Sequence, residues 1–239
     1  MIDELLAPKY LGWLWHGFLT TLWLAVCVCL AATLLGFVLC VLRVAGGRAA
    51  AAPVRTYLSV FRNTPLLVQL FFWYFGAAAL MPESWLVWLN TPRAWQAVGL
   101  TLAWPPFEYV AGFFGLTLYT AAFVAEELRA GVQAVPAGQV QAALALGFRR
   151  AQLWRQVIMP QALRIALGPV IGQYMNAVKN SSMTMAIGLA ELSYASRQVE
   201  TETFKTFQAF GVATLLYVVL ILLMEWAGQA LRRRTAYPH

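Results

Sequence analysis

The sequence predicts an all-α membrane protein with about five transmembrane helices, and its composition and apolar runs support this. Of the 239 residues, 61% are hydrophobic and only 11% are charged, whereas a soluble domain carries about 25% charged residues. A helix needs about 20 mostly apolar residues to cross a bilayer. We expect five such spans, centred near residues 29, 71, 116, 177 and 215.

Each expected span coincides with a stretch that is almost free of charge. Four of them contain no charged residue at all: 17–42, 63–82, 109–125 and 206–224. The fourth span along the chain, residues 165–190, carries one charge, Lys179. The spans cover most of the chain, so residues 1–239 are expected to form a single transmembrane domain.

Basic residues predict the orientation of the spans. They concentrate on one set of connections: Arg43, Arg48, Arg55, Arg62, Arg129, Arg149, Arg150, Arg155, Arg164, Arg232, Arg233 and Arg234. The positive-inside rule places this set in the cytoplasm. The N-terminus is then outside and the C-terminus is cytoplasmic, as an odd number of spans requires. The net charge of +7 is therefore a topology signal and does not indicate nucleic-acid binding.

Two external connections are expected. Residues 81–108 form a Trp-rich loop or an interfacial segment, because tryptophan gathers at headgroup level. Within it, residues 94–107 are too short for a span and end in two prolines, so an extra re-entrant or interfacial helix is the alternative there. Glu191, Glu200 and Glu202 are expected to be solvated in the other outer loop.

The sequence does not indicate an enzyme. It has two histidines, His16 and His239, and no G-x-x-x-x-G-K-[ST] phosphate loop. The three cysteines all fall in the first span and are best explained as small apolar side chains. We therefore expect no catalytic residue, no metal and no cofactor on this chain.

The long cytoplasmic connection, residues 129–164, contains an element of its own. Gln139 to Leu146 favours a helix, Gly147 interrupts it, and helical spacing resumes from Arg149 to Ile158 before Pro160 is expected to stop it. Taken alone, this pattern is typical of an amphipathic helix pair that skirts the membrane surface.

The spacing of this connection resembles the cytoplasmic loop of permease subunits in ATP-binding-cassette (ABC) importers. That pattern is E-A-A, three residues, G, nine residues, I-x-L-P. Matching residues fall in register here, with Gln for Glu, Val for Ile and Met for Leu: Gln141, Ala142, Ala143, Gly147, Val157, Met159 and Pro160. The resemblance implies that residues 137–160 couple the membrane domain to a separate ATPase, with Ala142, Ala143 and Gly147 forming the docking surface.

Other segments resemble the polar amino-acid branch of these permeases. They are FRNTPLLVQLFFWYF (61–75), GLTLYTAAFVAEELRAGVQAVPAGQ (115–139) and KNSSMTMAIGLAEL (179–192). YLGWLWHGFLTTLWLA, near the N-terminus, looks most like the glutamate/aspartate group. Importers of glutamine, asparagine or other amino acids are alternatives, as is a structural membrane subunit of another complex.

The family resemblance implies a type I ABC importer permease in the bacterial inner membrane, passing several times through the lipid bilayer. It implies a second permease subunit, identical or related, and two nucleotide-binding ATPase subunits that hold ATP and magnesium. It also implies an external substrate-binding protein. The function expected is ATP-driven, binding-protein-dependent import of polar amino acids, with glutamate and aspartate as the expected substrates.

Lys179 is the main candidate for a substrate residue. A charged side chain at the bilayer centre costs about 2.5–3.5 kcal/mol on insertion scales, so such residues usually face a cavity or a partner. Asn180, Ser181 and Ser182 follow at once, and we expect this polar turn to line the substrate path. The alternative is a lysine that reaches the outer headgroups or pairs with an acid on the partner subunit.

A second pair of charges lies near the expected cytoplasmic ends of two spans. Arg62 and Glu126 are placed at similar depth by the predicted topology and could close an inner gate. The alternative is that both side chains extend separately to the headgroups.

Overall fold

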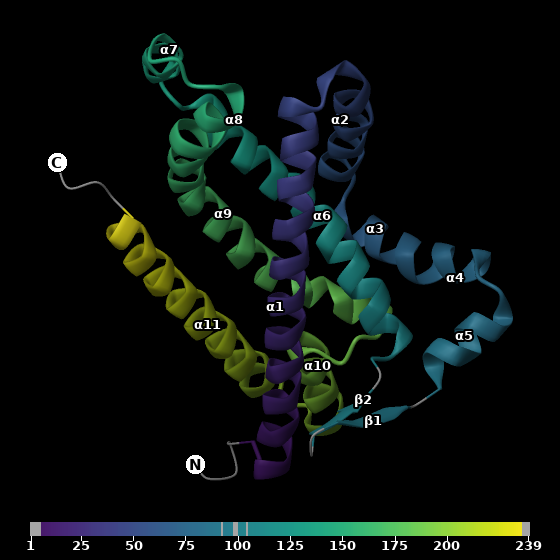
Figure 1. Ribbon diagram of the computed structural model, residues 1–239. Helices are drawn as coiled ribbons and strands as arrows, with labels where there is room; N and C mark the ends of the chain where they lie inside the picture. Colours follow the sequence, from purple (N-terminus) through teal and green to yellow (C-terminus); the bar gives the residue numbers. More distant parts are fainter. Residues whose placement is uncertain (1–5, 92, 98–99, 104, 236–239) are drawn as a thin grey trace. The chain divides into compact units, whose positions relative to one another are not determined.

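The computed structural model describes residues 6–91, 93–97, 100–103 and 105–235. Most of them are helical (Figure 1), which confirms the predicted fold class. The α-helices are α1 (Pro8–Ala45), α2 (Gly47–Asn63), α3 (Leu66–Phe71), α4 (Ala77–Leu80), α5 (Glu83–Asn90), α6 (Phe107–Gln133), α7 (Ala137–Ala145), α8 (Arg150–Gln152), α9 (Met159–Ser181), α10 (Leu192–Thr203) and α11 (Thr206–Thr235). Two π-helical turns (Phe72–Gly76 and Leu153–Ile158) and a 3₁₀ segment (Ser182–Ile187) adjoin them.

Three helices among the described residues are long and apolar enough to cross a membrane: Pro8–Ala45, Phe107–Gln133 and Thr206–Arg233. They coincide with the first, third and fifth expected spans. The second expected span falls on a shorter apolar helix, Leu66–Leu80, and the fourth on α9. The number of five spans and their orientation stay predictions, and both chain ends lie outside the described residues.

Residues 81–108, which the sequence predicts to be external, contain α5 and a two-stranded hairpin. β1 (Ala94–Ala97) pairs antiparallel with β2 (Leu100–Ala103), so that Ala94 lies opposite Ala103. The alternative of an extra helix over 94–107 is therefore wrong, and the alternation Leu100-Thr101-Leu102 is a strand pattern. Residues 92, 98, 99 and 104 of this segment lie outside the described residues.

The chain divides into two compact units. The first unit consists of Met1–Val28, Thr64–Tyr119 and Ala177–Val218. In its core, Leu14 of α1 packs with Leu192 and Val199 of α10 and with Ala209 of α11. Gly17 permits this contact, because a Cβ built there would lie 2.8 Å from the Cβ of Ala195.

The sequence predicted that Glu191 would be solvated, but this residue of the first unit is buried. Its side chain is 0% exposed and caps α10, where it accepts a hydrogen bond from the Tyr194 N–H at 2.9 Å. The Tyr217 hydroxyl donates to it at 2.7 Å and the Thr21 hydroxyl at 3.4 Å. The carboxyl group is buried because α1, α10 and α11 supply donors that replace water.

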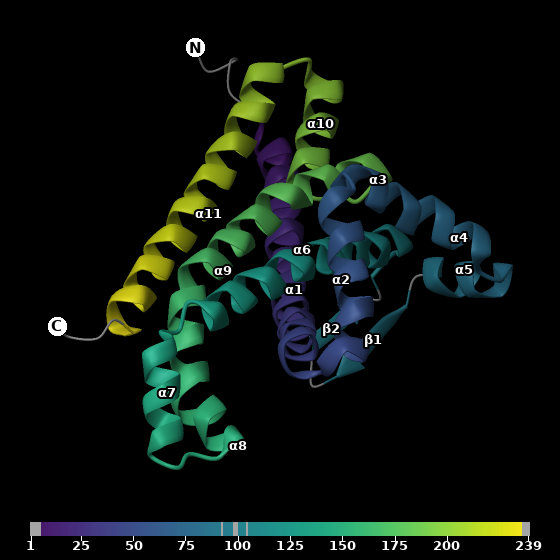
Figure 2. The same cartoon turned by 90° about the horizontal axis from the view of Figure 1, so that it is seen from above.

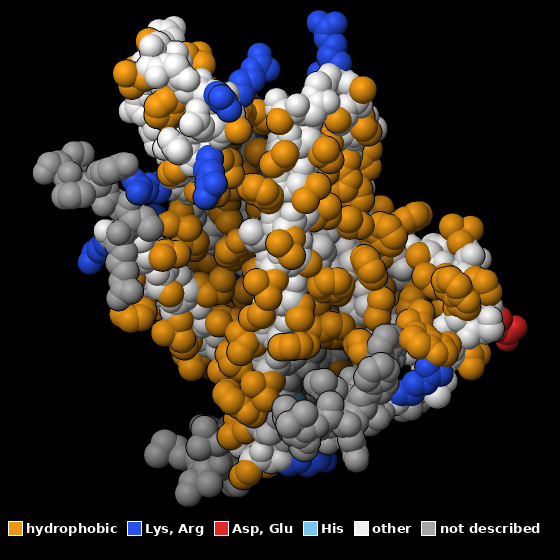
Figure 3. Space-filling view, in the orientation of Figure 1, with side chains coloured by type: hydrophobic (Ala, Val, Ile, Leu, Met, Phe, Trp, Pro, Cys, Tyr) orange, Lys and Arg blue, Asp and Glu red, His pale blue; other side chains and the backbone are white. Residues whose placement is uncertain are grey.

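The second unit consists of Cys29–Asn63, Thr120–Asn176 and Val219–His239. Leu39 of α1, Val54 and Leu58 of α2 and Ala125 of α6 form one of its apolar clusters. Figures 1 and 2 both show α7 and α8 at one end of α9. Basic side chains gather at the end that carries α2 and α7, whereas apolar side chains cover much of the remaining visible surface (Figure 3).

Pro160 does not stop a helix, contrary to the prediction. Helical structure is continuous from Arg150 to Ser181 and passes through both Pro160 and Pro169. A proline has no N–H to donate, and its ring crowds the carbonyl four residues earlier. The π-helical turn Leu153–Ile158 ends two residues before Pro160. Such a turn changes the hydrogen-bond register where a regular α-helix would be broken.

Candidate functional site

Residues 137–158 form the helix–Gly–helix element that the sequence predicted. The end of α7 is closed by hydrogen bonds from the Leu146 N–H to the Ala142 carbonyl at 3.0 Å and from the Phe148 N–H to the Ala143 carbonyl at 3.1 Å. Gly147 has φ +80°, in the left-handed region that L side chains rarely adopt. Glycine is therefore required for the close turn between α7 and α8.

The exposed face of α7 differs from the predicted docking surface in one residue. Gln141, Ala142 and Gly147 are exposed, but Ala143 is buried. The Ala143 side chain packs in a cluster with Leu153 and Ile158. Through this contact Ala143 holds α7 against the segment that leads into α9.

Two leucines take part in the exposed face, and the sequence pattern did not single them out. Leu144 is 50% exposed and Leu146 is 78% exposed. No sequence signal pointed to Leu146, because it lies three residues after Ala143 and helical spacing would place it on the buried side. It is exposed because α7 ends at Ala145 and Leu146 belongs to the turn that follows. Val157, Met159 and Pro160 are only half-buried, and Val157 packs against the cluster that holds Ala143.

Lys179 lies in the last turn of α9 and its side chain is exposed. The α-helix ends at Ser181 and is followed by the 3₁₀ segment Ser182–Ile187, after which Gly188 has φ +83°. A cation at a helix C-terminus is stabilised by the partial negative charge there. Lys179 is thus placed at a break in the helix and not in the middle of a regular one.

The three polar residues after Lys179 are placed differently from one another. Asn180 is half-buried, whereas Ser181 is fully buried. The Ser181 hydroxyl donates to the Val178 carbonyl, and the Ser182 hydroxyl donates to the Lys179 carbonyl, each at 2.7 Å. Both hydroxyl donors are therefore used inside the backbone turn, and Ser181 is not accessible to a ligand in this conformation.

A further polar group on α9 was missed by the sequence reasoning. The Gln173 side-chain amide donates to Glu127 of α6 at 3.0 Å, and the Asn176 amide lies 3.4 Å from the Gln173 oxygen. Gln173, Asn176 and Lys179 are three residues apart, so helical spacing places them along one side of α9. That spacing was readable in the sequence, although the contact with Glu127 was not.

Glu126 is the centre of an arginine cluster in the second unit. Its carboxylate contacts Arg43 of α1 at 2.5 Å and Arg129 of α6 at 2.6 Å. Arg62 of α2, the predicted partner, is 3.9 Å away. The two shorter contacts were not predicted, although Arg129 lies three residues after Glu126 on the same helix, a spacing typical of ion pairs.

Within the described ranges, no group of three or more His, Cys, Asp or Glu side chains is placed to hold a metal ion. The described residues do provide ion pairs around Glu126, a hydrogen bond between Gln173 and Glu127, and exposed apolar side chains next to Gly147.

Comparison with known proteins places the chain among transport proteins. Residues 32–237 match the family model "Binding-protein-dependent transport system inner membrane component". The chain is 32% identical over 230 residues to the glutamate/aspartate import permease protein GltJ of Escherichia coli strain K12, covering 96% of this chain and 89% of that protein. It is 33% identical to the octopine transport system permease protein OccM of Rhizobium meliloti, covering 86% and 82%. The arginine transport system permease protein ArtQ of Bacillus subtilis is 29% identical, covering 92% and 90%.

Solved structures agree with these relatives. The crystal structure of an amino acid ABC transporter with histidines matches with a TM-score of 0.80 and 27% identity, over 95% of each chain. An inward-facing structure of the MetNI methionine ABC transporter matches with a TM-score of 0.77 over 97% of this chain and 100% of that chain. At 19% identity, the second match supports the fold alone.

Proposed function

Because this chain belongs to the family of binding-protein-dependent transport system inner membrane components, we propose that it imports acidic amino acids, glutamate and aspartate. It is the permease subunit of an amino-acid ABC importer, and ATP is hydrolysed by a separate subunit. The observation that carries the acidic substrate is Lys179, an exposed cation at the break that ends α9.

Charge favours an anionic substrate over the other candidates. Asn180 next to Lys179 adds no negative charge, so the end of α9 presents a cation beside a neutral amide. A lysine attracts the side-chain carboxylate of glutamate or aspartate and repels a cationic side chain. The relationship to GltJ supports the same class. Glutamine and asparagine are the second candidates, because Lys179 could bind the α-carboxylate that all amino acids share.

The break in α9 supports a site at this position. Substrate sites in other classes of transporter form where membrane helices are interrupted and backbone groups are free to bind a ligand. We infer that Lys179 binds a substrate carboxylate and that Asn180 adds a hydrogen bond. Ser181 and Ser182 support the turn through their backbone hydrogen bonds and are not proposed as ligands.

The coupling surface is proposed to be the exposed side of α7 and the turn after it. Gln141, Ala142 and Gly147 would be covered by the ATPase together with Leu144 and Leu146. Ala143, Val157, Met159 and Pro160 would hold this surface in place from below. Because α7 packs directly on the segment that continues into α9, a movement of the ATPase would be transmitted to the helix that carries Lys179.

The arginine cluster around Glu126 is proposed as the inner latch of the path. Arg43 and Arg129 bind the carboxylate closely, whereas Arg62 contacts it at 3.9 Å. A contact of that length between partly exposed side chains contributes little free energy. Arg62 is thus the partner that can separate from Glu126 most easily. Opening of the latch would release Arg62 and α2, while Glu126 keeps its contacts with Arg43 and Arg129.

The complex proposed contains this chain and a second permease subunit, identical or related, with two nucleotide-binding ATPase subunits on the cytoplasmic side. A substrate-binding protein would deliver the amino acid from outside. The N-terminus would be outside, the C-terminus inside, and the membrane would be the bacterial inner membrane.

The experiment replaces Lys179 in the reconstituted complex. Lys179→Met keeps an unbranched apolar stem and removes the charge, and Lys179→Arg keeps the charge. We expect Lys179→Met to lose most ATP-dependent glutamate uptake and Lys179→Arg to retain part of it. Lys9→Met, which removes an exposed lysine of the first unit, is the control and should transport normally. Normal glutamate uptake by Lys179→Met, with normal insertion and ATPase binding, would disprove the assignment.

A further inference from the structure

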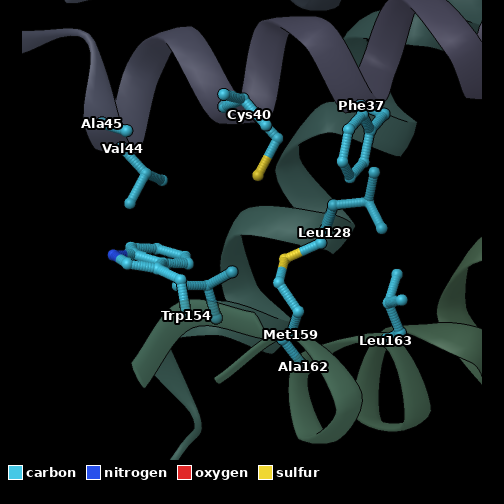
Figure 4. Close-up of a pocket in the computed structure, with 11 residues that line it drawn as sticks. Phe37, Cys40, Val44, Ala45, Leu128, Trp154, Met159, Ala162 and Leu163 are labelled. Atoms are coloured by element: carbon cyan, nitrogen blue, oxygen red, sulfur yellow. The ribbon is translucent and has the colours of Figure 1, made fainter. Parts of the chain in front are cut away.

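An apolar cavity of about 420 Å³ lies between α1, α6 and α9 in the second unit. Figure 4 shows Phe37, Cys40 and Val44 of α1 on one side and Leu128 and Met159 on the other. None of the described residues that line it is charged. Its volume falls in the range of ligand pockets, about 300–1,000 Å³, and its lining suits a hydrocarbon chain and not an amino acid.

A basic pocket of about 480 Å³ adjoins this cavity. Val44 and Val132 line both, so the two spaces meet at these side chains. Four arginines line the basic pocket: Arg43, Arg48, Arg55 and Arg129. A polar space adjacent to an apolar one is the arrangement that an amphiphile requires.

The charges in the basic pocket are not balanced. Glu126 pairs with Arg43 and Arg129. In the part of the chain that the structure describes, neither Arg48 nor Arg55 forms an ion pair with an acidic side chain, and the Arg55 Nε donates only to the Ala51 carbonyl, at 3.3 Å. Arginine binds phosphate oxygens with two parallel hydrogen bonds. The four arginines and Glu126 together leave a net positive charge at this pocket, which favours an anionic ligand such as a phosphodiester.

We propose that the second unit binds one anionic phospholipid of the cytoplasmic leaflet. The phosphate is held by Arg48 and Arg55, with Arg43 and Arg129 adding positive potential, and one acyl chain enters the cavity beside Met159 and Trp154. Basic pockets between membrane helices on the cytoplasmic side are suited to anionic headgroups. Because Arg43 also binds Glu126, the lipid would stabilise the arginine cluster in its closed arrangement. This proposal does not depend on which amino acid is imported.

The test measures lipid retention by the intact permease–ATPase complex. The complex is purified in detergent, depleted of lipid, and supplied with phosphatidylglycerol or phosphatidylcholine of the same chain length, and bound lipid is counted by native mass spectrometry. We expect preferential retention of phosphatidylglycerol. The double variant Arg48→Gln/Arg55→Gln should lower that affinity by roughly thirtyfold, the loss that two arginines near a headgroup imply. Arg233→Gln, which removes an exposed arginine of the same unit, should have no effect.

A second variant tests the acyl chain separately. Val41→Trp, at a position that lines the apolar cavity and not the basic pocket, fills the cavity and should reduce retention of phosphatidylglycerol. Val38→Trp adds the same bulk to α1 at a 50% exposed position outside the cavity and should not. Val41→Leu fills the cavity less and provides the result if Val41→Trp does not fold. Equal retention of both lipids, or phosphatidylglycerol binding unchanged in the double variant, would overturn the proposal. Full displacement by inorganic phosphate would also overturn it, since it would show a site for free phosphate instead of a lipid.

Discussion

Leu146 provides a sharp test of how this permease contacts its ATPase. Its side chain is 78% exposed beside the turn at Gly147. Burying a whole leucine side chain is worth about 1.5–3 kcal/mol. If docking covers the exposed part, Leu146→Ala should cost about 1–2 kcal/mol of association, which raises the dissociation constant about 5- to 30-fold. Its effect on folding should be small, because little of the side chain contacts the rest of the chain.

The assay measures the affinity of the purified permease for its ATPase, followed by substrate-stimulated ATP hydrolysis in proteoliposomes. Leu144→Ala, at 50% exposure, should give a smaller loss in the same direction. Leu231→Ala removes a 46% exposed leucine of α11 and serves as the matched control. An unchanged dissociation constant for Leu146→Ala, with an unchanged thermal midpoint, would refute the proposal that Leu146 belongs to the coupling surface.

Three further predictions concern single positions. Gly147→Ala should lower the free energy of unfolding by about 1–2 kcal/mol through backbone strain. No steric clash adds to this cost, because a Cβ built there meets no atom within 4 Å. Gly147→Asn should cost less, and chemical denaturation in detergent would compare the two variants. Burial raises the pKa of the Glu191 carboxyl despite four hydrogen-bond donors, so the folded state binds more protons than the unfolded state. The free energy of unfolding should therefore fall as the pH rises through the window between the unfolded pKa and the raised folded pKa. Glu191→Gln should remove this pH dependence in thermal melts, and a pH dependence that persists in the variant would contradict Glu191 as its source. Glu126→Gln should lower the free energy of unfolding by about 1.5–3 kcal/mol, the range for a hydrogen bond to a charged group. Arg62→Ala should lower it by about 1 kcal/mol or less. Equal losses in detergent melts would contradict the conclusion that Arg62 is the weaker partner of Glu126.

Composition and apolar runs were sufficient to predict the helical membrane fold, because each long uncharged run has only one way to satisfy its backbone in lipid. The coupling element was also readable, since Gly147 separates two helix-forming segments. Its outward face was not. Hydrophobicity suggests that Leu146 should be buried and Ala143 exposed, but the structure shows the reverse. The small Ala143 packs against Leu153 and Ile158, and the larger Leu146 extends outward.

Tertiary contacts account for the other differences. Local rules predict that a helix ends at Pro160, but the helix continues through it after the π-helical turn Leu153–Ile158. Glu191 reads as solvated because its donors, Thr21 and Tyr217, are remote in sequence. The same limitation hid the contact of Arg43 with Glu126, which joins two helices that no sequence spacing relates.

The central proposal is that this permease carries acidic amino acids through a path that contains Lys179. The most direct measurement is uptake of a labelled amino-acid panel by proteoliposomes that contain the permeases, the ATPase and the external binding protein, with and without ATP inside. We predict ATP-dependent uptake of glutamate and aspartate, with little uptake of glutamine, asparagine or arginine. Uptake of a neutral or cationic amino acid in preference to glutamate and aspartate would contradict it.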